Sequence, residues 1–393
     1  MTSATDIELD ELRARIRAFI AERAPRMTVR PGHRAPEPED VPALRAWTAA
    51  LYASGWFGAG WPEEWGGRPD AHPLTAVVLV EELARAGAPA PIGAGYLASR
   101  AIATFGSEAQ KARYLPRIRS GDDLWCQLFS EPDAGSDLAS LRTRAVRDGD
   151  SYVIDGQKVW TTNGQFADVG FLLARTDPEV PKHAGITAFA LSMRSPGITV
   201  RPLRELTGTA DFNEVVLEGV RVAADDVIGA SGQGWRIATH ALSHERHANA
   251  GLPVRLQRAA DRLMDMARRT PIGNGPASAD PRVRQILAAL YTEVRVCRLL
   301  HLASLQRTVA KVEAPADGPL NKLFSSELNL RLTEAALAIG GPGALLAPGE
   351  PDAVDEGRWP DEFLYGRAYP IAGGSNEIMR NVLAERVLGL PRE

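Results

Sequence analysis

The sequence lacks the features that mark several protein classes. Its 393 residues include only two cysteines, Cys126 and Cys297, which lie far apart, so neither a disulfide framework nor a cysteine zinc site is indicated. A balance of 45 Lys plus Arg against 49 Asp plus Glu gives no basic face for nucleic acid. Apolar runs stay far below the ~20 residues of a membrane helix, and the N-terminus has helix spacing rather than a signal-peptide block. We therefore expect a soluble, cytoplasmic protein that binds neither nucleic acid nor membrane.

The chain instead has an ordinary globular composition, with 45% hydrophobic and 24% charged residues, and a length that suggests two or three domains. Apolar residues recur at helical spacing up to about residue 120, give way near Leu124 to short β-branched runs separated by Asp-Gly and Pro-Gly pairs, and return to helical spacing from Trp235. The predicted fold is α+β. We place an α-helical domain at 1–123, an antiparallel β domain at 124–234 and a four-helix bundle at 235–393. The strand pattern fits a small barrel or a sandwich, and we predict a barrel.

Two polar segments of the middle domain are candidates for a site. The turn at 129–137 (FSEPDAGSD) can present backbone N–H groups and hydroxyls to a polar ring or a phosphate. The segment 156–164 (GQKVWTTNG) carries Trp160, whose flat surface can stack on a cofactor ring. Composition alone leaves the first segment as an ordinary loop and Trp160 as a core side chain.

Together, in this order and between two helical regions, the segments resemble those of the acyl-CoA dehydrogenase family. The resemblance extends to 205–208, 211–215, 232–235 and the C-terminal GGSNEIM at 373–379, and so runs from about residue 70 to the end. It implies FAD as the cofactor.

The resemblance also implies which residues touch FAD. Ser130 and Ser136 match positions at the flavin pyrimidine edge and the thioester region, and Trp160 and Thr162 match those flanking the isoalloxazine. An Arg-x-x-Phe-Gly segment, whose Arg reaches the diphosphate across the dimer in the family, is absent here, and Arg269 is the candidate to replace that Arg. The implied cofactor residues are Phe129, Ser130, Gly135, Ser136, Trp160, Thr162, Arg269, Gly340, Gly341, Ser375 and Glu377.

The catalytic base is expected at an alternative position. Many family members carry a Glu where this chain has Gly373, whereas a branch like isovaleryl-CoA and long-chain acyl-CoA dehydrogenases places it on the first bundle helix, ahead of an Arg. Glu245 and Arg246 match that branch. Same-face neighbours of Glu245 are mostly apolar and small, which predicts a desolvated carboxylate with a raised pKa, suited to a base. The alternative is a surface Glu paired with an Arg.

The implied reaction is α,β-dehydrogenation of an acyl-CoA, or an acyl carrier protein thioester, to a trans-2-enoyl product. Glu245 removes the α-proton, hydride passes to flavin N5, and the backbone N–H of Gly373 donates to the thioester oxygen. Ser136 and Arg246 face the substrate. The implied partners are an electron-transfer flavoprotein and further copies of the chain in a dimer or homotetramer, with a heterotetramer as another option. The alternatives are a flavin-dependent monooxygenase on the same fold and a non-catalytic partner subunit.

Three histidines form the remaining motif. His240, His244 and His247 fall at i, i+4 and i+7, but HERH is one residue short of the HExxH zinc pattern. We interpret them as surface or interhelix side chains and predict no metal site.

Overall fold

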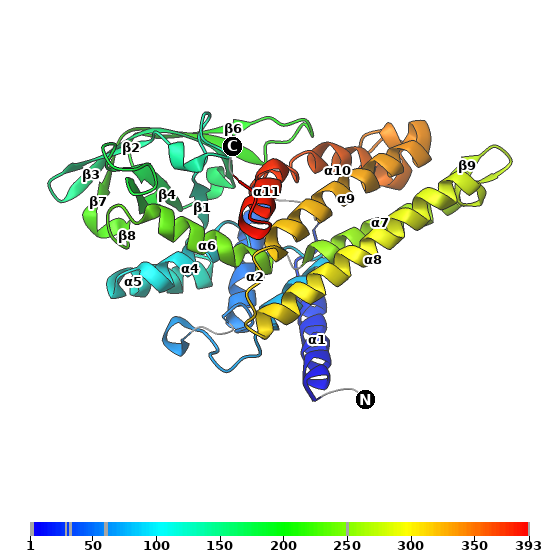
Figure 1. Ribbon diagram of the computed structural model, residues 1–393, viewed down its shortest axis with the longest axis horizontal. Coiled ribbons are helices and arrows are strands. Elements are labelled where there is room, and N and C mark those ends of the chain that lie inside the picture. The colour runs from blue at the N-terminus through cyan, green and yellow to red at the C-terminus, as the bar shows by residue number, and fades with distance from the viewer. Residues whose placement is uncertain (1–3, 28–29, 31–33, 59–61, 249–250, 392–393) are drawn as a thin grey trace. The chain divides into compact units, whose positions relative to one another are not determined.

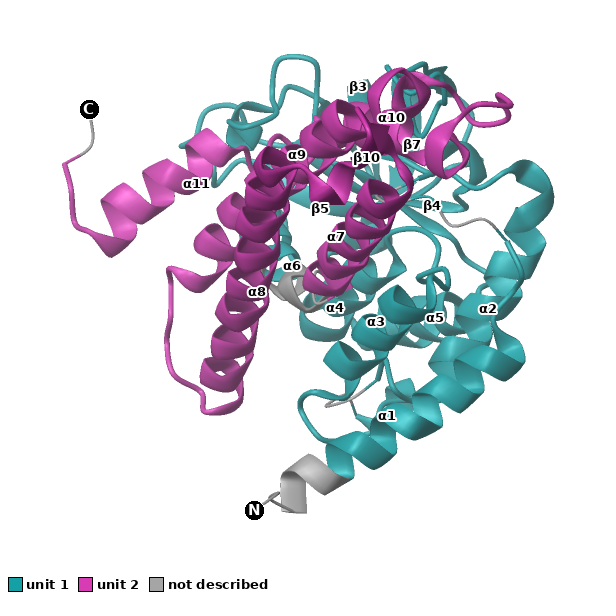
Figure 2. Ribbon diagram, turned by 90° about the vertical axis from the view of Figure 1, so that its right-hand side faces the viewer, with its two compact units in different colours: residues 1–248 teal, residues 249–393 magenta. Residues whose placement is uncertain are grey.

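The computed structural model describes residues 4–27, 30, 34–58, 62–248 and 251–391, and at 4–7 and 243–248 only the backbone (Figure 1). The chain divides into two compact units, 1–248 and 249–393, which are described separately (Figure 2).

The first unit begins with helices whose ends have local causes. Helix α5 starts with a capping box, in which Ser107 Oγ accepts from the Gln110 N–H and the Gln110 side chain accepts from the Ser107 N–H. Gly87 and Gly121 end α3 and α5 in the left-handed conformation that glycine adopts readily. The helices are α1 (Ala4–Arg23), α2 (Val41–Ala53), α3 (Thr75–Ala86), α4 (Gly95–Phe105) and α5 (Glu108–Ser120).

An eight-stranded sheet follows, with the strand order β6-β7-β3-β2-β4-β5-β8, and β1 pairs with β4. The strands are β1 (Trp125–Leu128), β2 (Arg144–Asp148), β3 (Ser151–Thr162), β4 (Val169–Arg175), β5 (Ile186–Ser192), β6 (Ile198–Leu203), β7 (Phe212–Ala223) and β8 (Val227–Ile228). The short strands expected between Leu124 and Trp235 are therefore confirmed.

The closed antiparallel barrel was the wrong detail of the fold prediction. Within the described residues, β6 and β8 end the path without pairing to each other, and β4 pairs in parallel with both β1 and β2. The tight hairpin turns in the sequence suggested only antiparallel neighbours. Strand β1 precedes the first hairpin in the chain and pairs with β4 in parallel, which no hairpin turn indicates. The result is a mixed, open sheet.

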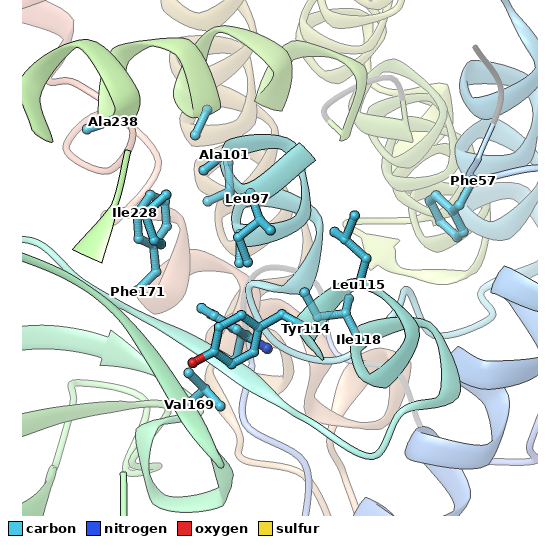
Figure 3. Packing of buried hydrophobic residues seen from close by; sticks show 14 of the residues in the cluster. Phe57, Leu97, Ala101, Tyr114, Leu115, Ile118, Val169, Phe171, Ile228 and Ala238 are labelled. Atoms are coloured by element: carbon cyan, nitrogen blue, oxygen red, sulfur yellow. The ribbon is translucent and has the colours of Figure 1, made fainter. Parts of the chain in front are cut away.

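Helices cover the middle of this sheet. The last helix of the unit, α6 (Gly234–Ala248), contributes Ala238 to a core shared with Leu97 and Ala101 of α4 and with Phe171 of β4 (Figure 3). Almost every residue of β4 and β5 is buried, because both faces of these strands are covered.

The second unit is helical. Its three long helices are α7 (Leu252–Arg269), α8 (Pro281–Val309) and α9 (Asp317–Gly340), followed by the shorter α10 (Arg358–Gly366) and α11 (Asn376–Val382). A small hairpin of β9 (Pro271–Ile272) and β10 (Gly275–Pro276) follows α7. The core of this unit packs α7, α8 and α9 around Leu263, Val294 and Leu332, with Trp359 of α10 fully buried against them. The helical region predicted from Trp235 onward begins with two helices, α6 and α7, which belong to different units.

Candidate active site

The two candidate segments of the middle region lie side by side. The N–H of Val159 donates to the carbonyl of Ser130 at 2.9 Å. Lys158 Nζ donates to the carbonyl of Phe129 at 3.0 Å and to Glu131 Oε1 at 2.8 Å. The turn at 129–137 is thus joined to the end of β3 through one backbone hydrogen bond and one buried ammonium group.

The joining ion pair is buried, with Lys158 0% and Glu131 7% exposed. Glu131 also accepts from the N–H groups of Arg142 and Thr143, at 2.6 and 2.9 Å. Burial acts to raise the pKa of Glu131, but Lys158 and these donors outweigh it and hold that pKa below its usual range. Burial lowers the pKa of Lys158 to about 8, against the attraction of Glu131. Both groups are therefore charged at neutral pH, and their hydrogen bonds are charge-assisted.

A β-bulge turns Trp160 outward. Between Lys158 and Thr161, β3 contains one more residue than the stretch of β7 that pairs with it. Trp160, within this bulge, has a φ of 60°. Tyr152 and Ile154 are buried at even positions like Lys158, so a regular strand would bury Trp160 as well. The bulge instead leaves Trp160 59% exposed, with its ring in edge contact with Phe212 at 6.0 Å between ring centroids.

The far side of the bulge is fixed by Asn213. Its Nδ2 donates to the carbonyl of Thr161 at 3.0 Å and to Gln165 Oε1. Three nearly buried side-chain oxygens here, those of Thr161, Asn163 and Asn213, have no hydrogen-bond partner among the described protein atoms. Buried polar atoms normally have partners, so this region is suited to additional polar contacts from water or a bound group.

The residues present fit the flavin that the resemblance implies. Trp160 offers an open aromatic face, while Ser130 and Thr162 are half-buried hydroxyls on the joined segments. A Cβ added to Gly135 would meet nothing within 4 Å, so this part of the turn is open to a ligand. Phe129 differs from the other predicted contacts, because its side chain is buried against Phe171 and leaves its backbone for any cofactor contact.

In the second unit, the predicted cofactor residues fall into two places. Ser375 caps α11 by accepting from the Ile378 N–H at 3.3 Å, and its turn is anchored near residues 322–327 of α9. Gly340 and Gly341 lie at the other end of α9, about 20 Å further along the helix. The structure therefore does not bring these two segments together within one unit.

Two charged residues of the predicted set differ in their surroundings. Glu377 is exposed, and hydrogen bonding to its own N–H and to Ser375 holds its pKa below the usual range. Arg269 already pairs with Asp355 at 2.6 Å, and Asp355 also accepts from the indole N–H of Trp359 at 2.8 Å. A diphosphate contact through Arg269 would therefore compete with an ion pair inside the unit.

The predicted base lies at the edge of what the structure describes. Glu245 and Arg246 belong to α6, but their side chains lie outside the described residues. The preceding part of the helix buries Ile237, Ala238 and Ala241 in the core of the first unit. The roles of Glu245 and Arg246 therefore remain predictions.

Sequence reasoning did not single out the Lys158–Glu131 pair, although a signal was present. By the alternation of a strand, Lys158 lies on the same face of β3 as the apolar Tyr152 and Ile154. A lysine on the inward face of a strand needs a buried partner. The partner Glu131 follows the predicted Ser130 directly. Asn213 carried no comparable signal, because its role depends on the bulge.

Among the described residues, no cluster of three His, Cys, Asp or Glu side chains is arranged to hold a metal ion. No helix in the described ranges has the length and apolarity to cross a membrane.

The strained bulge gives a testable prediction. We expect Trp160→Gly to unfold at a higher temperature than Trp160→Ala in the cofactor-free protein, because a non-glycine residue at positive φ costs ~1–2 kcal/mol. In a regular strand the order is reversed, since Gly is less favourable than Ala by about 0.5–1 kcal/mol. Thermal unfolding followed by circular dichroism compares the two. A less stable Gly variant would show that the bulge is not formed before flavin binds.

Comparisons with known proteins agree with this architecture. Three family models match in order: acyl-CoA dehydrogenase N-terminal domain at 6–122, middle domain at 126–220 and C-terminal domain at 232–388. Acyl-CoA dehydrogenase IpdE1 of Mycobacterium tuberculosis is 41% identical, over 98% of this chain and 99% of its own.

Solved structures give the same result. The Tcur3481-Tcur3483 steroid ACAD has a TM-score of 0.87 and 34% identity, over 98% of both chains. The ChsE4-ChsE5 complex from Mycobacterium tuberculosis has a TM-score of 0.82 and 31% identity, also over 98% of both chains. The chain therefore belongs to the acyl-CoA dehydrogenase family, as an oxidoreductase that acts on acyl-CoA and carries FAD.

Proposed function

We propose that the protein dehydrogenates a bulky, polycyclic acyl-CoA between its α and β carbons. The observation that carries this substrate class is the 34% identity, along nearly the whole chain, to a protein described as a steroid ACAD. Gly373 supports it, because the position is exposed and a Cβ there would meet nothing within 4 Å. A glycine therefore places no side chain where many family members carry a Glu.

The predicted site residues have separate tasks in this proposal. Glu245 accepts the α-proton, and the N–H of Gly373 donates to the thioester oxygen as negative charge develops there. Ser136 and Arg246 bind the substrate. Ser130, Trp160 and Thr162 hold the flavin, and FAD supplies the acceptor for the β-hydrogen, which leaves as hydride. An electron-transfer flavoprotein then takes the electrons.

A partner chain is a second element of the proposal. Two similar structures are described by pairs of chain names, Tcur3481-Tcur3483 and ChsE4-ChsE5, and both exceed 30% identity to this chain. We infer that this protein also assembles with a second, related chain. In such an assembly this chain could supply the base or serve as the non-catalytic subunit, and the presence of Glu245 favours the former.

Anaerobic flavin bleaching tests the function. The yellow holoprotein, alone and with a candidate partner chain, is mixed with a steroid-type acyl-CoA, a branched acyl-CoA or a short straight-chain acyl-CoA. We expect rapid bleaching by the polycyclic thioester and a product lighter by two hydrogens in mass spectrometry. Bleaching only by short chains would contradict the substrate class. No bleaching by any acyl-CoA, with or without the partner, would contradict the catalytic role.

A further inference from the structure

A lysine outside the predicted site closes the turn that carries Gly373. Lys322 Nζ, on α9, donates to the carbonyl of Pro370 at 2.8 Å and to Asn376 Oδ1 at 2.8 Å. The N–H of Asn376 donates to the same carbonyl of Pro370 at 2.7 Å. Both ends of the segment 370–376 therefore meet at one ammonium group.

The anchor is embedded in α9. Asn376 is 3% exposed and its Oδ1 also accepts from Ser326 Oγ at 3.0 Å. Lys322 is half-buried, and this burial lowers its pKa to about 8, while the nearby Glu377 acts in the opposite direction and Arg380 adds to the lowering. The group is therefore mainly an ammonium at neutral pH, and its bonds to the turn are charge-assisted.

The first part of the turn is also held by backbone hydrogen bonds, since the N–H groups of Ile371 and Ala372 donate to the carbonyl of Ala368 at 3.0 and 2.9 Å. The glycines that follow are less constrained. Gly373 and Gly374 have φ values of 67° and 90°, and glycines lose much conformational freedom when a loop is ordered. Residues 371–373 are exposed, with Ile371 69% exposed. The direction of the Gly373 N–H thus depends on how the two ends of the turn are fixed.

We propose that Lys322 is a positioning residue that holds the turn 370–376 so that the Gly373 N–H points to the thioester oxygen. This inference rests on the proposed function, in which that N–H stabilises developing charge. Lys322 acts through Pro370 and Asn376. A displacement of about 1 Å at such a donor can cost ~100-fold in rate, so a distant anchor can have a large effect.

The test compares Lys322→Met with Lys311→Met in the holoprotein. Lys311 is an exposed lysine of the same unit and serves as the matched control. We expect flavin reduction by the best acyl-CoA to slow at least about tenfold in Lys322→Met and to stay near the parent rate in Lys311→Met. Amide hydrogen exchange should rise in peptides covering 368–380 and stay unchanged in the rest of the second unit.

Chemical rescue separates positioning from a general folding defect. Lys322→Cys treated with 2-bromoethylamine regains an amine at nearly the length of lysine, and should recover much of the lost rate and protection. The two native thiols should not interfere, since Cys126 and Cys297 are buried and burial raises their pKa values to about 12 and about 11.

Three results would overturn the inference. The first is a Lys322→Met rate equal to that of Lys311→Met. The second is that amide hydrogen exchange in 368–380 becomes faster in Lys322→Met while the rate of flavin reduction stays unchanged, which would make the lysine purely structural. The third is loss of rate with exchange rising across the whole unit and no rescue by alkylation. If the parent protein is not reduced by any acyl-CoA, the proposed function fails instead, and the exchange experiment alone decides whether Lys322 fixes the turn.

Discussion

Glu245→Gln is expected to retain bound FAD, but its flavin should be reduced by acyl-CoA at least ~100-fold more slowly than that of the parent. This factor is the lower end of the range for loss of a positioned base. Gln is nearly isosteric with Glu but cannot accept the α-proton as a carboxylate does. Stopped-flow absorbance under anaerobic conditions gives the rate constant. Glu218→Gln, at an exposed position of β7, is the matched control and should leave the rate unchanged.

A second readout isolates the proton step. In D2O the parent should exchange the α-hydrogen of an acyl-CoA analogue that cannot lose a β-hydride, and Glu245→Gln should not. A variant that reduces flavin within about tenfold of the parent and still exchanges the α-hydrogen would restore the interpretation of Glu245 as a surface side chain paired with an Arg.

The helices and most strands could be predicted because each depends on a local pattern. The alternation along β3 and the continuous apolar runs of β4 and β5 are visible in the sequence. Strand β1 was harder to identify, because its partner β4 lies some 40 residues later and the pairing is parallel. No turn joins the two strands, so nothing local marks the pairing, and the closed barrel was predicted in place of an open sheet.

The candidate site likewise contains residues that local motifs predict and features that depend on residues far along the chain. Ser130 and Trp160 could be named from their motifs, and the structure joins their segments. The exposure of Trp160 could not be predicted, because a bulge fixed by Asn213, over 50 residues later, reverses the alternation of β3. Lys322 was equally hidden, since its partners lie about 50 residues further along the chain.

Lys158→Met is expected to destabilise the first unit strongly. It leaves the carboxylate of Glu131 buried with only backbone N–H donors, and removal of one partner of a buried pair costs about 3–5 kcal/mol. The variant should also lose FAD during gel filtration, because Lys158 joins the Ser130 turn to the Trp160 strand. Thermal unfolding and the ratio of flavin to protein absorbance measure the two effects.

Two companion variants test the cause of that loss. Lys158→Met combined with Glu131→Gln should recover part of the stability, since no charge is then left buried, but it should not recover FAD binding if the ammonium is needed to join the two segments. Lys111→Met removes a lysine that pairs with the exposed Glu108 three residues away, and such a pair contributes only about 0.2–0.5 kcal/mol. Equal losses for Lys158→Met and Lys111→Met would show that the Lys158–Glu131 pair does not hold the candidate flavin site together.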